Sequence, residues 1–179
     1  AESIFAVKYK RNENSFIIFG EDVIHRWTNS ICVLDHDTCC GSDKFGNIFV
    51  LRTGDNADDE VDGSGARTLW DAGGRSQLEA ECHYYLGDIV TSLRKAQFVA
   101  GGKEMLLAAT LGGELYALQP ITNKGDLTFY TDLETFLRNE ISTICGRVHQ
   151  SYRSYYQPVR NVIDGDLCSQ YATLPFAKQ

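Results

Sequence analysis

A group of cysteine and histidine residues in the first quarter of the chain is the first place where this sequence could do chemistry. Cys32, His36, Cys39 and Cys40 are four possible zinc ligands with the spacing C-x3-H-x2-C-C. Structural zinc sites are usually built from separated pairs of the C-x2-C kind, and the sequence contains none. The spacing therefore favours small buried thiols in a sheet, and a zinc site is the alternative.

Paired acidic residues are the second candidate. Asp35 and Asp37 alternate onto one face of an extended chain, where two carboxylates could act as general acid and base. Acids at such positions are more often solvated strand ends or acceptors in turns, and no G-x-S-x-G motif of a hydrolase accompanies them. An acid pair alone predicts no active site, and catalysis is the alternative.

The stretch NVIDGDLCSQY at 161–171 raises the same question, because two acids flank a glycine. Asp164 suits the N-cap of a helix whose first turn contains Gly165 and Asp166. A carboxylate in the first turn also interacts favourably with the helix dipole. We therefore interpret Asp164, Gly165 and Asp166 as a structural helix cap and not as a metal or acid–base site.

Residues 53–77 are rich in glycine and aspartate and predict a long exposed acidic loop. Within it, Asp58, Glu60 and Asp62 imitate the start of a calcium-binding loop. The twelfth position of that loop would be Leu69, where a bidentate glutamate is required. The pattern favours a flexible loop over a calcium site.

Basic and aromatic side chains alternate near the C-terminal end. The candidate partner-interface residues are Arg147, Tyr152, Arg153, Tyr155 and Tyr156. Such residues can stack on RNA bases, but tyrosine and arginine are also enriched at the centres of protein interfaces. From residue 131 onwards five acidic residues offset five Lys and Arg, so no basic field is present to attract phosphate. We expect packing or a protein interface, and RNA binding is the alternative.

Composition supports an ordinary globular chain. The sequence has 179 residues, is 43% hydrophobic and carries a net charge of −7, which disfavours wide electrostatic contact with nucleic acid. No apolar run suits a secretory signal or a membrane span. The six cysteines have no disulfide-framework spacing, so we expect reduced thiols in the nucleus or cytoplasm, with no cofactor and no bound metal.

The elements that would position these residues are mostly strands in the first two thirds of the chain. Short runs rich in Ile, Val and Phe are separated by turn residues, which is typical of antiparallel strands. The predicted strands span residues 4–9, 15–20, 30–35, 47–52, 81–86, 89–99, 104–111 and 114–121.

Two parts of this region follow one plan of strand, strand, glycine-containing turn and apolar strand. Gly46 in the first part corresponds to Gly112 or Gly113 in the second, and IFVL corresponds to LYAL. Repeated antiparallel units of roughly 40 to 50 residues indicate a β-propeller, which needs about 4 to 8 blades to close. Only two to three blades are recognisable. We therefore predict a mainly β fold with part of a propeller in 1–122, whose sheet edges are completed by other polypeptide.

The pattern becomes helical after these strands. An apolar stripe predicts a helix over 131–141, capped by Thr131 or Asp132. A second helix is predicted over 149–156. Residues 123–179 are thus predicted to be the start of a C-terminal helical domain.

The same residues carry a resemblance that covers nearly the whole chain. YRSYYQPVRNVIDGDLCSQY at 152–171, LDHDTCCGSDKFGNIFVLR at 34–52 and the NADDEVDG loop resemble the family of large propeller subunits of splicing factor 3b. IDGDL alone resembles only the wider family of the cleavage and polyadenylation specificity factor A-subunit region, which includes the large damaged-DNA-binding subunit.

This resemblance implies a scaffold of three propellers followed by a helical domain. The chain would supply the last blades of a seven-bladed, WD40-like propeller and the start of that domain. The implied role is non-enzymatic: the scaffold holds the HEAT-repeat subunit and a small subunit of splicing factor 3b. It does so in the nucleus, during branch-site recognition by the U2 small nuclear ribonucleoprotein in pre-mRNA splicing.

The remaining propellers of the parent protein are also implied partners, whereas nucleic acid and membrane are not. The alternative within the family is an adaptor of a ubiquitin ligase acting in DNA repair, or of an mRNA 3′-end cleavage and polyadenylation complex. Outside the family, the alternatives are the enzyme, zinc protein and RNA-binding protein considered above.

Overall fold

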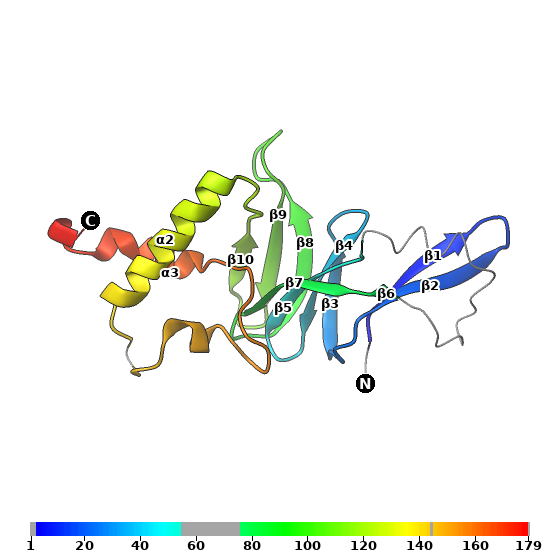
Figure 1. The fold of residues 1–179 in the computed structure, drawn as a ribbon, viewed down its shortest axis with the longest axis horizontal. Coiled ribbons are helices and arrows are strands. Elements are labelled where there is room, and N and C mark those ends of the chain that lie inside the picture. The colour runs from blue at the N-terminus through cyan, green and yellow to red at the C-terminus, as the bar shows by residue number, and fades with distance from the viewer. Residues whose placement is uncertain (1–2, 55–75, 144, 179) are drawn as a thin grey trace.

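The computed structural model describes residues 3–54, 76–143 and 145–178. Three sheets follow one another along the long axis of the molecule, and the helices lie at the end opposite the β1–β2 hairpin (Figure 1). The strands are β1 (Phe5–Lys10), β2 (Ser15–Glu21), β3 (Thr28–Val33), β4 (Thr38–Asp43), β5 (Asn47–Arg52), β6 (Ser76–Gln77), β7 (Glu79–Tyr85), β8 (Val90–Ala96), β9 (Met105–Thr110) and β10 (Leu115–Leu118). The helical elements are α2 (Lys124–Glu140), α3 (Gly165–Ser169) and the 3₁₀ turns η1 (His149–Tyr152), η2 (Gln170–Thr173) and η3 (Phe176–Lys178).

The central sheet has the strand order β3-β4-β5-β7, and all neighbours are antiparallel. Four antiparallel strands in chain order make one propeller blade. The second sheet, β8-β9-β10, repeats the first three strands of this blade. The prediction of a mainly β, partial propeller followed by a helical segment is confirmed.

Glycine-containing turns occupy equivalent places in the two blades. Gly46 lies between β4 and β5 with φ +94°, and Gly113 lies between β9 and β10 with φ +91°, so Gly113 and not Gly112 is the counterpart of Gly46. A Cβ at Gly46 would come within 2.7 Å of the Asp88 carbonyl oxygen. Only glycine fits this turn, since both its φ and its close neighbour exclude a side chain.

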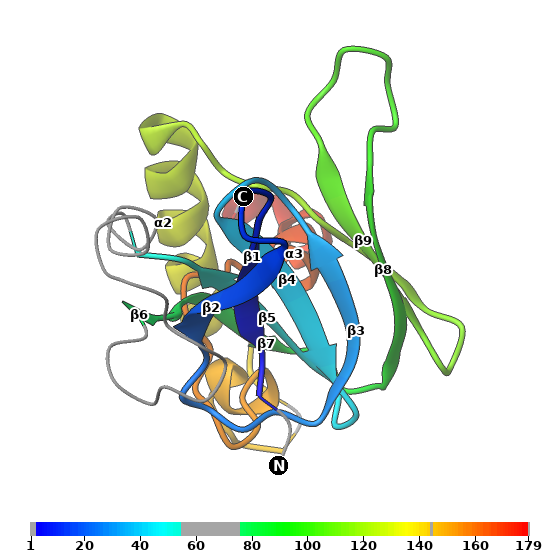
Figure 2. The ribbon, with the colours of Figure 1, turned by 90° about the vertical axis from the view of Figure 1, so that its right-hand side faces the viewer.

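The third sheet is the β1–β2 hairpin with β6 paired in parallel to β2. Its turn contains the predicted Asn12–Asn14 residues, and Asn14 has φ +47°. Viewed along the stack, the hairpin lies in front of the central sheet (Figure 2). Ile4 and Ala6 at the start of the hairpin, together with Leu78 after β6, pack with Phe49 and cover this face of the central blade.

The apolar strand β5 illustrates this packing. Ile48 is buried with Leu93 of the second sheet, whereas its neighbour Phe49 is buried with Ile4 and Leu78 on the opposite face. Because alternate side chains of a strand point to opposite faces, a strand buried on both faces needs a continuous apolar run. This explains why β5 has the sequence IFVL without polar alternation.

The first predicted helix is present, but its predicted start was wrong. Helix α2 begins at Lys124, and the side chain of Asn123 caps it by accepting a hydrogen bond from the Gly125 N–H at 3.0 Å. The apolar stripe from which this helix was predicted lies in its second half, where Leu137 is fully buried. The first half is exposed on all sides, so periodicity could not reveal it.

The predicted helix over 149–156 was also wrong, because only the 3₁₀ turn η1 forms there. The chain then becomes irregular, and Tyr156 adopts φ +44°. The predicted acidic loop 53–77, with its calcium-like acids, lies outside the described residues except for its ends. No described helix has the length and apolar character of a membrane-spanning segment.

Candidate protein-interaction surface

The irregular segment 153–162 runs along the edge of β7 that the central sheet leaves open. The backbones of His83 and Arg160 exchange two hydrogen bonds, 3.1 Å and 2.9 Å long. The Tyr85 N–H also donates to the Arg153 carbonyl at 3.1 Å. Covering a sheet edge satisfies backbone groups that could otherwise pair with another chain. The segment also brings its aromatic side chains to the turn between β4 and β5.

A continuous aromatic surface results from this return of the chain. We use the name aromatic surface for five residues: Trp27, Phe45, Tyr85, Tyr155 and Tyr156. The Tyr155 ring stacks on Tyr85 at a centroid distance of 5.4 Å and contacts Phe45 at 5.9 Å. Tyr156 contacts Phe45 at 6.1 Å and Tyr155 at 5.5 Å. Rings at these separations interact favourably with one another.

Lys44 joins Trp27 to the other rings. Its ammonium group lies 3.6 Å from the centroid of the Trp27 ring and 5.2 Å from that of Phe45. A cation over an aromatic face is attracted by the ring quadrupole. The lysine therefore holds both rings in one continuous patch.

The aromatic surface is open to solvent. The exposed fractions are 50% for Trp27, 38% for Phe45, 47% for Tyr155 and 50% for Tyr156. Contiguous exposed aromatic rings on a folded domain mark interaction sites more often than isolated apolar side chains do. Tyrosine and tryptophan are also the residues that most often dominate binding energy at protein interfaces.

A buried carboxylate anchors the surface from below. Asp43 is fully buried and accepts hydrogen bonds from the Phe45 and Asn47 N–H groups and from the Asn47 side chain, at 2.8 to 2.9 Å. The Tyr156 hydroxyl also donates to Asp43. Partial burial, together with this carboxylate, raises the pKa of Tyr156. Tyr156 is thus fixed at its hydroxyl end, while its ring edge remains exposed.

His83 lies next to this anchor and is only 4% exposed. Its ring contacts the Tyr156 ring at 6.1 Å, and neither ring nitrogen has a hydrogen-bond partner among the described residues. Burial, reinforced by the nearby Arg26 cation, lowers the pKa of His83 to about 4. His83 is therefore neutral at physiological pH.

A second buried carboxylate joins the helical elements. Asp164 is 2% exposed, caps α3 through the Asp166 and Leu167 N–H groups, and receives hydrogen bonds from Arg153 and His149 at 2.7 Å and 2.5 Å. Burial opposes its ionisation, but the hydrogen bonds from Arg153 and His149 outweigh burial and hold the pKa of Asp164 below its usual range. The acidic motif is thus a structural junction.

The structure separates the five predicted interface residues into three places. Tyr155 and Tyr156 belong to the aromatic surface. Arg153 turns inward to Asp164, whereas Tyr152 interacts with Cys145 and the exposed Arg147 lies near it. The three remaining members of the aromatic surface were not predicted. Only Phe45, an apolar residue inside a turn sequence, could have been noticed from the sequence.

Of the four possible zinc ligands, Cys32 and Cys40 lie opposite each other on β3 and β4 and share one side of the sheet, but the four do not converge on one point. Cys39 and Cys40 are adjacent on β4, and Cys40 is buried against the second sheet while Cys39 packs with Phe49 on the other face. Burial raises the pKa of both thiols, which keeps them protonated. Among the described residues no group of three or more His, Cys, Asp or Glu could hold a metal ion.

Asp37, one of the possible acid–base pair, accepts a hydrogen bond from Arg52 at 3.0 Å and another from Thr38. The Thr38 contact lies at the turn that joins β3 to β4, whereas Arg52 is the last residue of β5. The carboxylate therefore connects this turn to the end of β5.

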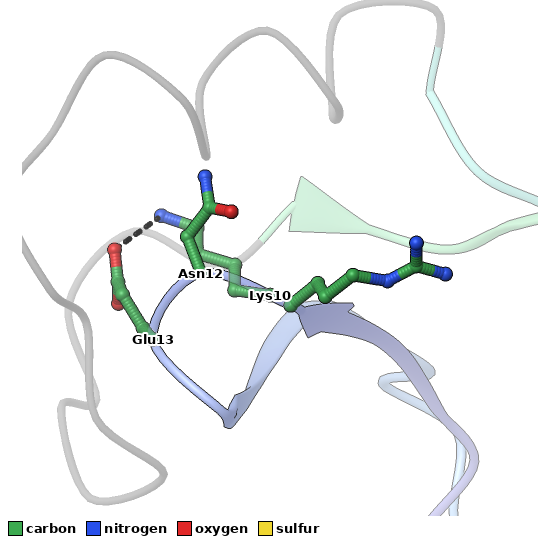
Figure 3. A pocket seen from close by; sticks show the side chains of 4 residues that line it. Lys10, Asn12 and Glu13 are labelled. Atoms are coloured by element: carbon green, nitrogen blue, oxygen red, sulfur yellow. Dashed lines mark ion pairs between the residues drawn. The ribbon is translucent and has the colours of Figure 1, made fainter.

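Two hollows lie away from the aromatic surface. One, of about 250 Å³, is formed by residues 10–13 at the tip of the β1–β2 hairpin, where Lys10 and Glu13 form a 3.9 Å ion pair (Figure 3). In Figure 3 the Lys10 and Glu13 side chains point toward each other across the turn. The other is an open apolar groove of about 410 Å³, lined by Phe129, Asp132, Leu133, Phe136, Tyr171 and Lys178.

Comparison with known proteins supplies the family context for this geometry. The family model described as the CPSF A subunit region matches residues 1–173. Splicing factor 3B subunit 3 of Danio rerio is 46% identical over 99% of the chain, and that of Drosophila melanogaster is 45% identical over 99%. Pre-mRNA-splicing factor prp12 of Schizosaccharomyces pombe is 40% identical over 99% of the chain. The chain spans 15% of the length of each of these relatives.

Proposed function

The chain belongs to the CPSF A subunit region family, and on this premise we propose that it is part of a non-enzymatic scaffold for pre-mRNA splicing in the nucleus. The observation that carries the proposal is the 46% identity, along 99% of the chain, to a relative named splicing factor 3B subunit 3. The proposed assembly is splicing factor 3b of the U2 small nuclear ribonucleoprotein. Its HEAT-repeat subunit and small subunit are the proposed partners.

Two features of the molecule support a scaffold role. Buried polar groups such as Asp43 and Asp164 hold segments together, as their hydrogen-bond partners come from distant parts of the chain. The described acids and thiols that could do chemistry serve turns, caps and cores. We further propose that residues 1–122 form the propeller part and 123–179 the start of a helical domain.

We place the protein interface at the aromatic surface. Its rings are exposed, packed against one another and held from below by Asp43, so a partner would not have to order them first. Pre-ordered aromatic side chains contribute strongly to affinity for this reason. Arg147 and Tyr152 are proposed as a flanking contact.

Affinity capture of the tagged full-length protein from nuclear extract tests this function. We expect the HEAT-repeat and small subunits of splicing factor 3b to be recovered. A double substitution, Phe45→Ala with Tyr155→Ala, should reduce recovery of at least one of them roughly tenfold. Phe16→Ala is the matched control, since Phe16 is also an exposed ring, 61% exposed, but lies on the β1–β2 hairpin.

Two other outcomes would contradict the proposal. Recovery of a ubiquitin-ligase cullin or of 3′-end cleavage factors, in place of spliceosomal subunits, would favour the other branches of the family. Equal losses with Phe16→Ala and with the double substitution would remove the interface from the aromatic surface.

A further inference from the structure

The aromatic surface combines ring faces with free hydrogen-bond donors. Within the described part of the chain, neither the Trp27 indole N–H nor the Tyr155 hydroxyl has a hydrogen-bond partner, and both side chains are about half exposed. Both donors belong to side chains of the aromatic surface. A ligand that offers compact apolar groups and backbone carbonyls would satisfy both features at once.

The surface also lacks net charge. Of the charged groups in contact with its rings, among the described residues, Lys44 is positive and lies over Trp27, and Asp43 is negative and lies buried under Tyr156. The chain as a whole carries −7. Binding of a phosphate backbone depends on several cationic side chains, so this surface favours an uncharged ligand over RNA.

Polyproline II segments have the required chemistry. Their carbonyl groups make no internal hydrogen bonds, and their prolyl rings are compact, apolar and already ordered. Aromatic-lined surfaces recognise such segments in several unrelated domains. One turn of this helix advances about 9 Å, which three successive rings spaced 5.4 Å and 5.9 Å apart can accommodate.

We propose that the aromatic surface binds a proline-rich segment of a partner protein in the polyproline II conformation. The prolyl rings pack on the exposed sides of Phe45, Tyr155 and Tyr85. The Trp27 N–H and the Tyr155 hydroxyl donate to carbonyl groups of the segment. This inference rests on the proposed interface and adds the chemical class of its partner.

Trp27 provides a direct readout of binding. In a Trp70→Phe background Trp27 is the remaining tryptophan, since the sequence has two. The probe is a ten-residue polyproline peptide titrated into the protein, with a Gly/Ser peptide of equal length and oligouridine as comparison ligands. We expect a saturable change of Trp27 emission with polyproline alone.

Variants make the assignment specific. Tyr155→Phe keeps the ring and the fold but removes one hydrogen-bond donor, so it should weaken polyproline binding several-fold. Phe45→Ala should weaken polyproline binding at least tenfold, and circular dichroism verifies that this variant is folded. Phe16→Ala should have no effect. Absence of a saturable change with polyproline, equal response to the Gly/Ser peptide, or a response to oligouridine alone would overturn the inference.

Failure of the inference and failure of the proposed function are distinguishable. A protein that captures its splicing subunits but ignores polyproline keeps the proposed function and loses this partner class. A protein that binds polyproline but recovers no splicing subunit keeps this partner class and loses the proposed function.

Discussion

His83 connects the central blade to the segment that covers it. Its backbone pairs with Arg160, while its ring is buried beside Tyr156 with both nitrogens unpartnered among the described residues. Burial of a histidine without partners disfavours the charged form. The residue is therefore neutral in the folded protein and can accept a proton freely only when the chain unfolds.

This arrangement predicts a loss of stability as pH falls from about 6.5 to 4. Between these pH values the His83 ring is protonated in the unfolded chain but stays neutral in the folded protein, where its pKa is about 4. Protonation of His83 in the unfolded chain should therefore lower the free energy of unfolding by about 2 kcal/mol between pH 7 and pH 5. Urea unfolding of wild type and His83→Gln at pH 7 and pH 5 measures it. The variant should lose less stability than wild type, and identical pH dependence would contradict the prediction.

Asp164 and Asp166 form a matched pair for a second prediction. Asp164 is 2% exposed and contacts both the Arg153 cation and the His149 ring, whereas Asp166 is 69% exposed and contacts Arg153 alone. Asp164→Asn keeps a capping side chain but leaves Arg153 half-buried without its main counter-charge, so we expect a loss of about 3 kcal/mol. Asp166→Asn should cost less than about 1 kcal/mol, as exposed ion pairs contribute little.

Thermal and urea unfolding of both variants provide the measurement. Equal losses for the two substitutions would mean that the junction between η1 and α3 does not depend on the buried charge.

The buried carboxylates Asp164 and Asp43 differ in how far their roles can be predicted from the sequence. Asp164 caps a helix that starts at the next residue, so its capping role can be inferred from local sequence. The partner of Asp43 is Tyr156, which is 113 positions away. No local pattern encodes such a pair, so the anchor could not be inferred from the sequence, and of the aromatic surface above it only Tyr155 and Tyr156 were predicted.

At the scale of elements, the equivalent turns of the two blades allow a controlled comparison. Gly46→Ala combines an unfavourable φ with a contact to the Asp88 carbonyl, and should cost about 3 kcal/mol or more. Gly113→Ala has a similar φ but open space around the new methyl group, and should cost about 1 kcal/mol. Urea unfolding of the two variants measures the difference. Similar costs for both would show that backbone conformation alone, and not the contact with Asp88, constrains the turn.

The strands were easier to predict than the helices, for a physical reason. Strands such as β5 are buried on both faces or alternate regularly, so composition and spacing reveal them. In α2 the apolar residues Leu127, Phe129 and Tyr130 are all exposed, so the first half of the helix carries no one-sided pattern. Its start depends instead on a single capping side chain, Asn123.

At the scale of the whole molecule, the two blades are unequal. The central blade has four strands plus the covering segment 153–162, whereas the second has three, and among the described residues β10 pairs only with β9. The internal repeat predicted both blades from the sequence. The return of segment 153–162 to β7 was not predicted, because edge pairing of an irregular segment leaves no periodic pattern.

The unpaired side of β10 predicts that the 179-residue chain associates with itself in solution. An open strand edge with an apolar flank is a template for pairing, and Leu115 on this strand is 66% exposed. Sedimentation velocity over a wide concentration range at physiological salt should therefore detect reversible association. Leu115→Lys places a charge on the edge strand and should weaken association roughly fivefold, since charged side chains protect natural sheet edges.

Leu111→Lys is the control for this prediction. Leu111 is 69% exposed but lies in the turn before β10, so the substitution changes net charge and surface polarity equally without altering the strand. If both lysine variants reduced association by the same factor, general charge repulsion would explain the effect. If only Leu115→Lys did so, the contact would lie on β10, the strand beside which a fourth strand would complete the second blade.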